Sequence, residues 1–435
     1  MRESIKKFSI RVAVMLVAVV AFYYGYSAWL TKQIDSLYQD RQIAVNHASG
    51  LPEKDKGNIL LNETLKDNKL VFLGSSELSS PVPENPKNLI PNNLYAGDAT
   101  FVGHAHVQNA LFAMYLGANA DTFDGKDIVI VESLQWFQGG DIGRDGFFAN
   151  FSEMQMYQFL NNPRISEANK KYLCNRYKQL ENKHRKNEYY NINNAASHSR
   201  LLNGINNVFL SKLRDKWPVV SGDFAFQETY VLSKLYLGEN KIERLFFQLT
   251  RPYYYIRCKN QELKDKFDSY KYLKTVNEQQ QREIVEIDWD EIYQIAEEEG
   301  MKACTNNDFY VYDNYYIKYL KKNWIKLKNS RVNTELLKSG EWKDFEFFLS
   351  VCKDLDIEPY IVSMSTNGRY YDYIGIEKEK RDLLYAKIEQ LSSEYGYDCL
   401  RTGDKEYEPY FYCDVMHLGW KGWPYVLQRV IEYFS

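Results

Sequence analysis

Four side chains in this sequence have the types needed for a serine–histidine–carboxylate catalytic triad. The stretch "VFLGSSELSS" (71–80) is apolar up to a glycine and then offers two adjacent serines, Ser75 and Ser76. Near the C-terminus, Asp414 stands three residues before His417. A serine becomes a nucleophile when a histidine accepts its proton and a carboxylate orients that histidine. Residues three apart share one face of a turn, so Asp414 could orient His417.

His417 is the strongest candidate for the general base among the six histidines. His184 and His198 lie in a charged region, and His47 follows the N-terminal segment. The two histidines of "FVGHAHVQ" could reach the site but have no carboxylate nearby in the sequence. A lone Asp-x-x-His pair is commonly a cap followed by a surface histidine. Here the pair follows the last predicted strand, which brings it to the sheet edge where functional groups gather.

The order of these residues is similar to that of the SGNH/GDSL hydrolases, with the serine on the loop after the first strand. In "GSSEL" the serine position of the G-D-S-[LI] motif is Ser76, so we predict Ser76 as the nucleophile. Ser75 remains the alternative. Donors to the oxyanion must point at the charge that develops in the transition state. The candidates are the backbone N–H of Ser76, the N–H of Gly103 and the side chain of Gln135.

The elements that must position these residues alternate along the chain between apolar runs and amphipathic segments. Runs such as "DIVIVESLQWF" are continuous and apolar, as in strands buried on both faces. The alternation predicts an α/β fold: a three-layer α/β/α, SGNH-hydrolase-like parallel sheet. The predicted strands are 69–76, 127–137, 357–368 and 397–404, and the predicted helices are 106–120, 339–356 and 377–396.

The middle of the chain has a different composition. Residues 150–329 are polar, charged and tyrosine-rich, and they predict a large, mostly helical insertion between the second and third strands. Within the insertion, the acidic segment 277–300 is expected to form a helix with a solvated face. With this insertion, residues 69–435 are predicted to form one extracytoplasmic catalytic domain.

Residues 12–30 form an uncharged apolar stretch that is preceded by four basic residues. Such a stretch nearly spans a bilayer core of roughly 30 Å. The positive-inside rule then predicts a single-pass membrane anchor with residues 1–11 in the cytoplasm and the catalytic domain outside. Residues 31–68 are expected to form a stalk with some helix. A cleaved signal peptide is the alternative, but the bulky Tyr26 and Trp29 make a poor cleavage site.

The overall composition excludes several classes of function. The formal net charge is −3, which gives no reason to expect a nucleic acid as partner. The six cysteines form no C-x-x-C pair, so neither a zinc site nor a cofactor is expected. Whether any of these cysteines form disulfides stays open, as does the oligomeric state.

Four motifs of the sequence have a distinctive pattern. They are "FLGSSEL" (72–78), "SLQWF" (133–137), "STNGRYYDYIG" (365–375) and "YEPYFYCDVMHLGWKGW" (407–423). In these motifs the sequence resembles the DltD family of D-alanyl-lipoteichoic acid biosynthesis proteins from Gram-positive bacteria, and the N-terminal anchor fits this resemblance as well. One departure is Leu134, where the family pattern has proline. A second is "SMSTNG" in place of a more proline-containing segment.

The resemblance implies a role in moving D-alanine onto (lipo)teichoic acid outside the cell membrane. It implies as partners a membrane-bound O-acyltransferase and a carrier protein that holds D-alanine as a thioester. One spanning segment cannot pass an acyl group across the bilayer, so a multi-spanning partner must deliver it. The resemblance also implies a catalytic set of Ser76, Asp414 and His417.

A set of aromatic and polar residues near the strand ends is expected to bind substrate. Asp372 could bind the ammonium group of D-alanine, while tyrosines could line a groove for the polymer. The predicted substrate-binding residues are Trp136, Asn367, Tyr371 and Asp372. Two other functions remain open: an SGNH-type esterase or thioesterase that releases D-alanine to water, and a non-catalytic scaffold for the carrier protein and the acyltransferase.

Overall fold

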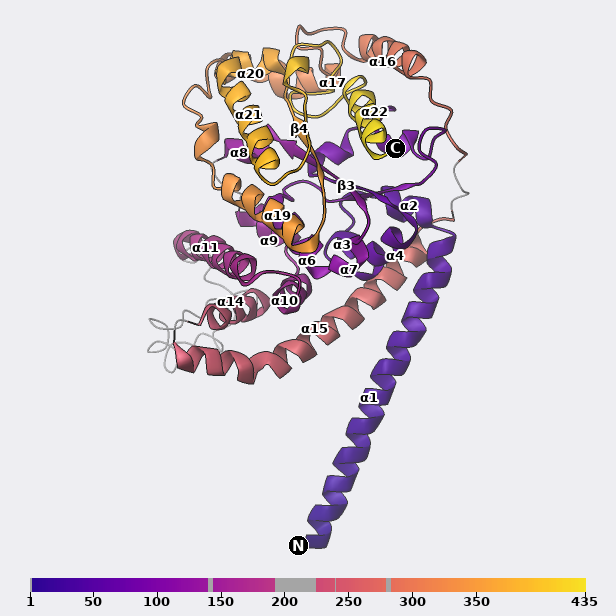
Figure 1. The fold of residues 1–435 in the computed structure, drawn as a ribbon, viewed down its shortest axis with the longest axis vertical. Coiled ribbons are helices and arrows are strands. Elements are labelled where there is room, and N and C mark those ends of the chain that lie inside the picture. Colours follow the sequence, from indigo (N-terminus) through magenta and orange to yellow (C-terminus); the bar gives the residue numbers. More distant parts are fainter. Residues whose placement is uncertain (1, 140–143, 192–223, 239, 279–282) are drawn as a thin grey trace.

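A five-stranded parallel sheet forms the centre of the molecule (Figure 1). The computed structural model describes residues 2–139, 144–191, 224–238, 240–278 and 283–435. All neighbouring strands pair in parallel, in the order β2-β1-β3-β4-β5. This confirms the predicted α/β class. The strands are β1 (Leu70–Leu73), β2 (Ala99–Val102), β3 (Asp127–Ser133), β4 (Tyr360–Met364) and β5 (Cys399–Arg401).

Helices cover both faces of this sheet because successive strand residues point to opposite sides. On one face, Val71 and Ile128 join a core with helices α6, α19 and α21. On the other, Phe72 and Val129 pack with helix α22. The fold therefore has the three layers that the alternation predicted. These helices are α6 (Asn109–Ala118), α19 (Glu341–Leu355), α21 (Lys378–Glu394) and α22 (Gly422–Phe434).

Two parts of the sheet differ from the prediction. Strand β2 was not predicted, because its four residues, three of them apolar, follow a long turn-rich segment. The strand predicted for 127–137 ends at Ser133, and "LQWFQ" forms a short helix instead. In parallel sheets the chain commonly continues into a helix after the carboxyl end of a strand. The apolar residues at the end of this run, Leu134, Trp136 and Phe137, therefore pack into the core with α6 and α19.

The insertion between β3 and β4 is largely helical in its described parts. In the described part of its acidic segment, Val285 forms an isolated bridge with Asn92, and the helix begins only after Asp288, which caps it. Residues 192–223, 239 and 279–282 of the predicted insertion lie outside the described residues. The main helices are α10 (Glu153–Asn161), α11 (Glu167–Asn191), α14 (Phe224–Leu237), α15 (Lys241–Thr275) and α16 (Trp289–Ala303).

Helix α1 (Arg2–Gln39) projects away from the rest of the chain as one long rod (Figure 1). It is long and apolar enough to cross a membrane, and none of the residues in its most apolar 18-residue stretch is buried. The segment predicted as a stalk packs onto the body, where Tyr38, Val45, Leu60 and Leu273 share a small core. It contains α2 (Gln42–His47), α3 (Pro52–Asp55) and α4 (Ile59–Asp67).

Short segments connect these larger elements. They are the 3-10 turns η1 (Ser76–Ser79), η4 (Lys321–Asn323), η5 (Leu336–Lys338) and η6 (Gly403–Lys405), the π-helical turn η3 (Tyr316–Leu320), and the helices α5 (Pro86–Leu89), α7 (Ala120–Phe123), α8 (Leu134–Gln138), α9 (Arg144–Asn150), α17 (Asp313–Tyr315), α18 (Trp324–Leu327) and α20 (Gly368–Ile374).

Candidate active site

Two segments from opposite ends of the chain form the candidate site at the carboxyl edge of the sheet. Strand β1 ends at Leu73, and after Gly74 and Ser75 the turn η1 begins with Ser76. The second segment is a tight loop between β5 and α22. An antiparallel bridge between Tyr412 and Leu418 closes this loop. The closed loop then presents its two polar side chains towards η1.

Asp414, His417 and Ser76 form a continuous chain of hydrogen bonds. The Asp414 carboxylate accepts from His417 Nδ1 at 2.7 Å, and His417 Nε2 lies 2.9 Å from the Ser76 Oγ. The second carboxylate oxygen accepts the backbone N–H groups of Met416 and His417 at 2.8 and 2.9 Å. Because the carboxylate accepts at Nδ1, that nitrogen carries the proton, and Nε2 is left to accept the serine proton.

Charged groups around His417 favour its protonated form. Burial lowers the pKa of this imidazole, but the hydrogen bond and negative charge of Asp414 outweigh burial, with a further contribution from Glu77. The net effect raises the pKa of His417 above its ordinary value. Glu77 is itself buried, which raises its own pKa, while the positive charge of His417 lowers it. Because the charge of each group shifts the pKa of the other, the titrations of Glu77 and His417 are linked. Glu77 directly follows the predicted nucleophile in the sequence.

We expect Glu77→Gln to shift the acidic limb of the pH–rate profile to lower pH. A protonated His417 cannot accept the serine proton, so activity appears as the pH rises through its pKa. Glu77 raises that pKa, and removing its charge lowers it. The measurement is the rate of Ser76 acylation by a fluorophosphonate between pH 5 and 8. The matched control is Glu84→Gln, a buried carboxyl whose charged neighbour is Glu299. A profile that Glu77→Gln leaves unchanged would contradict this linkage.

Ser75, the alternative nucleophile, has a structural role in the loop beside the site. Its side chain is buried, and its hydroxyl donates to the carbonyl of His104 at 3.2 Å. The same oxygen accepts the backbone N–H of His106 at 3.1 Å. These two bonds fasten the loop after β2 to the end of β1. The geometry therefore favours Ser76 over Ser75 as the residue that His417 can activate.

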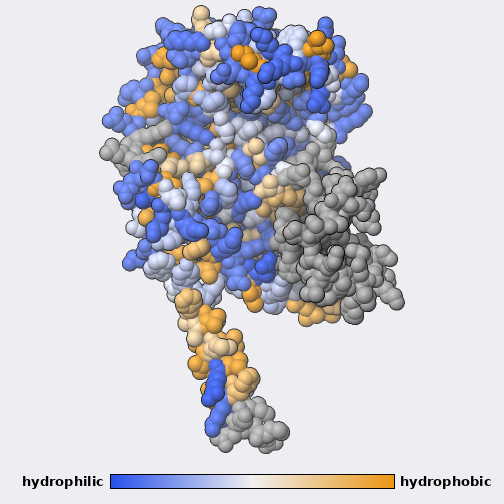
Figure 2. Space-filling view, turned by 180° about the vertical axis from the view of Figure 1, so that it is seen from behind, coloured by the Kyte–Doolittle hydropathy of each residue, from blue (hydrophilic) through white to orange (hydrophobic). Residues whose placement is uncertain are grey.

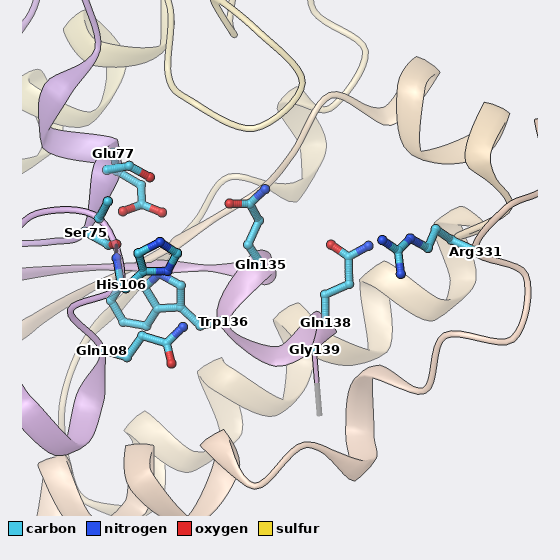
Figure 3. Close-up of a pocket in the computed structure, with 11 residues that line it drawn as sticks. Ser75, Glu77, His106, Gln108, Gln135, Trp136, Gln138, Gly139 and Arg331 are labelled. Carbon is cyan, nitrogen blue, oxygen red and sulfur yellow. Dashed lines mark hydrogen bonds between the residues drawn. The ribbon is translucent and has the colours of Figure 1, made fainter. Parts of the chain in front are cut away.

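A cavity of about 330 Å³ opens beside Ser76. Figure 3 shows Glu77, His106 and Trp136 at one end of it, with Gln138 and Arg331 at the other. Indole, imidazole and amide groups line the end near the serine, and a guanidinium lies at the far end. A cavity of this size and lining could hold a small polar group, and its guanidinium could bind a negatively charged one.

Two of the three predicted oxyanion donors, Gln135 and Gly103, occupy different positions, while the third is the backbone N–H of Ser76 itself. Gln135 at the start of α8 lines the cavity. Burial raises the pKa of the Tyr371 hydroxyl, and the Gln135 side chain partly offsets this rise. Gly103 has a φ of +107°, and a Cβ there would lie 2.2 Å from the Gly74 carbonyl oxygen. This glycine allows the ends of β1 and β2 to pass closely, and its N–H helps to lower the pKa of the buried Asp55 carboxyl, which burial raises to about 6. The structure thus brings Gln135, more than Gly103, to the cavity.

Of the four predicted substrate-binding residues, Trp136 lines the cavity and the other three do not. Tyr371 is buried, with Gln135 as a neighbour. Asn367 is buried, where its amide donates to the Phe309 carbonyl at 2.7 Å and its oxygen caps α20. Asp372 binds the Arg381 guanidinium at 2.7 Å and accepts from the Tyr407 hydroxyl at 2.6 Å. Asn367 and Asp372 therefore hold the fold together and do not line the cavity.

Several lining residues were not predicted from the sequence, among them the polar residues Gln108, Gln138 and Arg331. Gln108 precedes α6, and Gln138 ends the short helix that was expected to be strand. Arg331 comes from the returning end of the insertion, where its backbone N–H binds the Ile374 carbonyl at 2.8 Å. No strand end or motif marks this arginine, and only the folded chain brings it to the cavity.

Comparisons with known proteins relate this chain to one protein family. A family model described as "DltD protein" matches residues 49–435. The chain is 28% identical over 411 residues to protein DltD of Bacillus subtilis, covering 94% of this chain and 92% of that protein. It is 25% identical over 413 residues to protein DltD of Staphylococcus aureus, covering 94% and 91%. It is 25% identical over 373 residues to protein DltD of Lacticaseibacillus rhamnosus, covering 85% and 78%.

Proposed function

Because this chain belongs to the DltD family, we propose that it performs a serine-dependent acyl-transfer step in the D-alanylation of (lipo)teichoic acid. The observation that carries the proposal is the chain of hydrogen bonds from Asp414 through His417 to Ser76. This chain opens onto a cavity lined by an amide, an indole and a guanidinium. A scaffold protein would have no need of such an arrangement.

The first half-reaction forms an ester on Ser76. His417 Nε2 takes the hydroxyl proton while the Ser76 Oγ attacks the carbonyl carbon of a D-alanyl donor. In this proposal the Gln135 side chain, which lines the cavity beside Ser76, and the backbone N–H of Ser76 donate to the resulting oxyanion. When the bond to the donor breaks, His417 returns the proton to the leaving group. The D-alanyl group remains bound to Ser76 as an ester.

The second half-reaction reverses these roles. A hydroxyl of the teichoic acid polymer gives its proton to His417 Nε2 and attacks the ester carbonyl. The bond to Ser76 breaks, and His417 returns the proton to the Ser76 Oγ. Arg331, at the far end of the cavity, is placed to bind a phosphate of the polymer. Water as the acceptor in place of the polymer would make the protein an esterase or thioesterase.

The membrane arrangement follows from α1. We place the N-terminal residues in the cytoplasm and the catalytic domain outside, because basic residues precede the apolar stretch. A donor loaded with D-alanine inside the cell must then cross the bilayer through another protein. A multi-spanning O-acyltransferase that accepts D-alanine from a carrier protein has the required chemistry.

The decisive experiment traps the intermediate on the full-length protein. The protein is incubated in membranes with its partners and a D-alanyl donor, quenched in acid and digested for mass spectrometry. We expect a D-alanyl adduct on the peptide that contains Ser76, and its loss on addition of teichoic acid with gain of polymer ester. Release of free D-alanine without polymer would support the esterase. Absence of any adduct, together with full polymer esterification, would refute the serine ester.

A further inference from the structure

Helix α15 of the insertion runs beside the membrane anchor in the same direction. The Tyr23 hydroxyl of α1 donates to the Lys259 carbonyl of α15 at 2.6 Å. Further along both helices, the Lys266 ammonium donates to Ser27 and Thr31 at 2.9 and 2.8 Å. The two helices are therefore parallel, with the same N-to-C direction. Because α1 is the candidate membrane span, each residue of α15 can be assigned a depth relative to the bilayer from its neighbours on α1.

The first half of α15 lies at or below the level of Tyr23. Tyr23 belongs to the apolar stretch 12–30, and Lys259 lies beside it. Residues before Lys259 continue towards the side on which α1 projects. Pro252 interrupts the helix interior, where a proline bends the axis. Figure 1 shows that α15 curves away from α1 and passes under the domain towards α14.

This half of α15 is apolar on two opposite faces. One face packs onto the domain through Phe247, Tyr254 and Cys258. The other face carries large apolar residues at helical spacing, with side chains between 53 and 66% exposed. These residues are Ile242, Leu245, Phe246, Leu249 and Ile256. In Figure 2, apolar surface also appears on the underside of the domain, on the side from which the anchor emerges.

Basic residues accompany the exposed apolar face. Lys241, Arg244 and Arg251 fall in this half of the helix, against one acidic residue, Glu243. A helix that lies in a membrane interface buries an apolar face among the acyl chains and directs basic side chains to anionic headgroups. Apolar exposure of this size on a soluble surface marks an interaction site.

We propose that residues 241–256 of α15 form an interfacial membrane helix, whose exposed apolar face lies in the outer leaflet of the bilayer that α1 spans. The proposal rests on the membrane anchor in the proposed function, but not on the chemistry of Ser76. Two attachments, one spanning and one lying flat, fix the height and the tilt of the domain. A single anchor would leave the domain free to swing about its base.

The test uses full-length protein in vesicles of phosphatidylglycerol and phosphatidylethanolamine. Single cysteines are introduced by Leu245→Cys, Leu383→Cys and Val17→Cys, and each is labelled with bimane. Leu245 and Leu383 are both 58% exposed leucines on helices, but Leu383 lies on α21 far from the anchor. Labelling of the native cysteines, five of which are buried, is measured in the unsubstituted protein and subtracted. Lipids with a nitroxide at a shallow acyl position serve as the quencher.

We expect the label at residue 245 to be quenched several-fold more strongly than the label at residue 383. The label at residue 17 should be quenched by a deeper nitroxide, since it reports the anchor. Equal, weak quenching at 245 and 383, with strong quenching at 17, would overturn the interfacial helix and assign its apolar face to a protein partner. Weak quenching at all three positions would overturn the anchor, and the interfacial helix with it. None of these outcomes depends on D-alanyl transfer, which the trapping experiment measures separately.

Discussion

Ser76→Ala is expected to lower the rate of D-alanyl ester formation on teichoic acid by about a thousandfold or more, because the acyl group loses its covalent site. The Asp414–His417 pair remains, but its imidazole then has no hydroxyl to deprotonate. The measurement is the D-alanine content of teichoic acid in cells that lack the native protein and express the variant. Protein abundance in the membrane is measured in parallel, so that loss of activity is separated from loss of folding.

Ser75→Ala is the matched control for this prediction. Its hydroxyl bridges the His104 carbonyl and the His106 N–H, so its removal is expected to cost about 1–3 kcal/mol of stability. The esterification rate per folded molecule should stay within about tenfold of the unsubstituted protein, since removing a non-nucleophilic loop hydroxyl perturbs geometry alone. If Ser75→Ala abolished ester formation in folded protein while Ser76→Ala retained it, the two serines would have to exchange roles.

Arg381→Met is expected to lower the free energy of unfolding by about 3–5 kcal/mol, because it leaves a buried carboxylate without its cation. The Arg381 and Glu406 side chains are both fully buried, and the guanidinium binds both carboxylate oxygens, at 2.8 and 2.7 Å. A third bond from Arg381 to Asp372 joins α20 to the same group. The measurement is the midpoint of chemical denaturation of the purified protein in detergent.

Two further variants distinguish a buried charge from a general loss of packing. Lys378→Met breaks a half-exposed pair with Asp382 on the same helix and should cost less than about 1 kcal/mol. Adding Glu406→Gln to Arg381→Met removes the unpaired charge and should recover part of the lost stability. A double variant no more stable than the single one would show that the packing of the guanidinium dominates over its charge.

The sequence was sufficient to predict four of the five strands and the three residues that the structure joins by hydrogen bonds. Continuous apolar runs are distinctive of buried parallel strands, and the carboxyl ends of such strands meet at one edge. The proximity of Ser76 and His417 could therefore be predicted without knowledge of the contacts between them. The short edge strand β2 was missed because four residues give no periodicity to detect.

The substrate residues could not be predicted in the same way. A place at a strand end does not determine which way a side chain turns or what it binds. Asp372 was expected to bind an ammonium, but the nearby Arg381 on α21 already occupies its carboxylate. Arg331 reaches the cavity only because the insertion folds back across the sheet edge. Such contacts depend on long-range packing, which single-sequence patterns do not contain.

The distance along the chain between the two halves of the site has a consequence for biosynthesis. Ser76 and His417 are 341 residues apart, so the chain must be made as far as residue 417 before they meet. Chains are synthesised from the N-terminus, so the serine is made long before the histidine. A chain interrupted before His417 therefore carries Ser76 without the imidazole that we propose as its base. The proposed nucleophile is assembled only after the loop that follows β5 has been made.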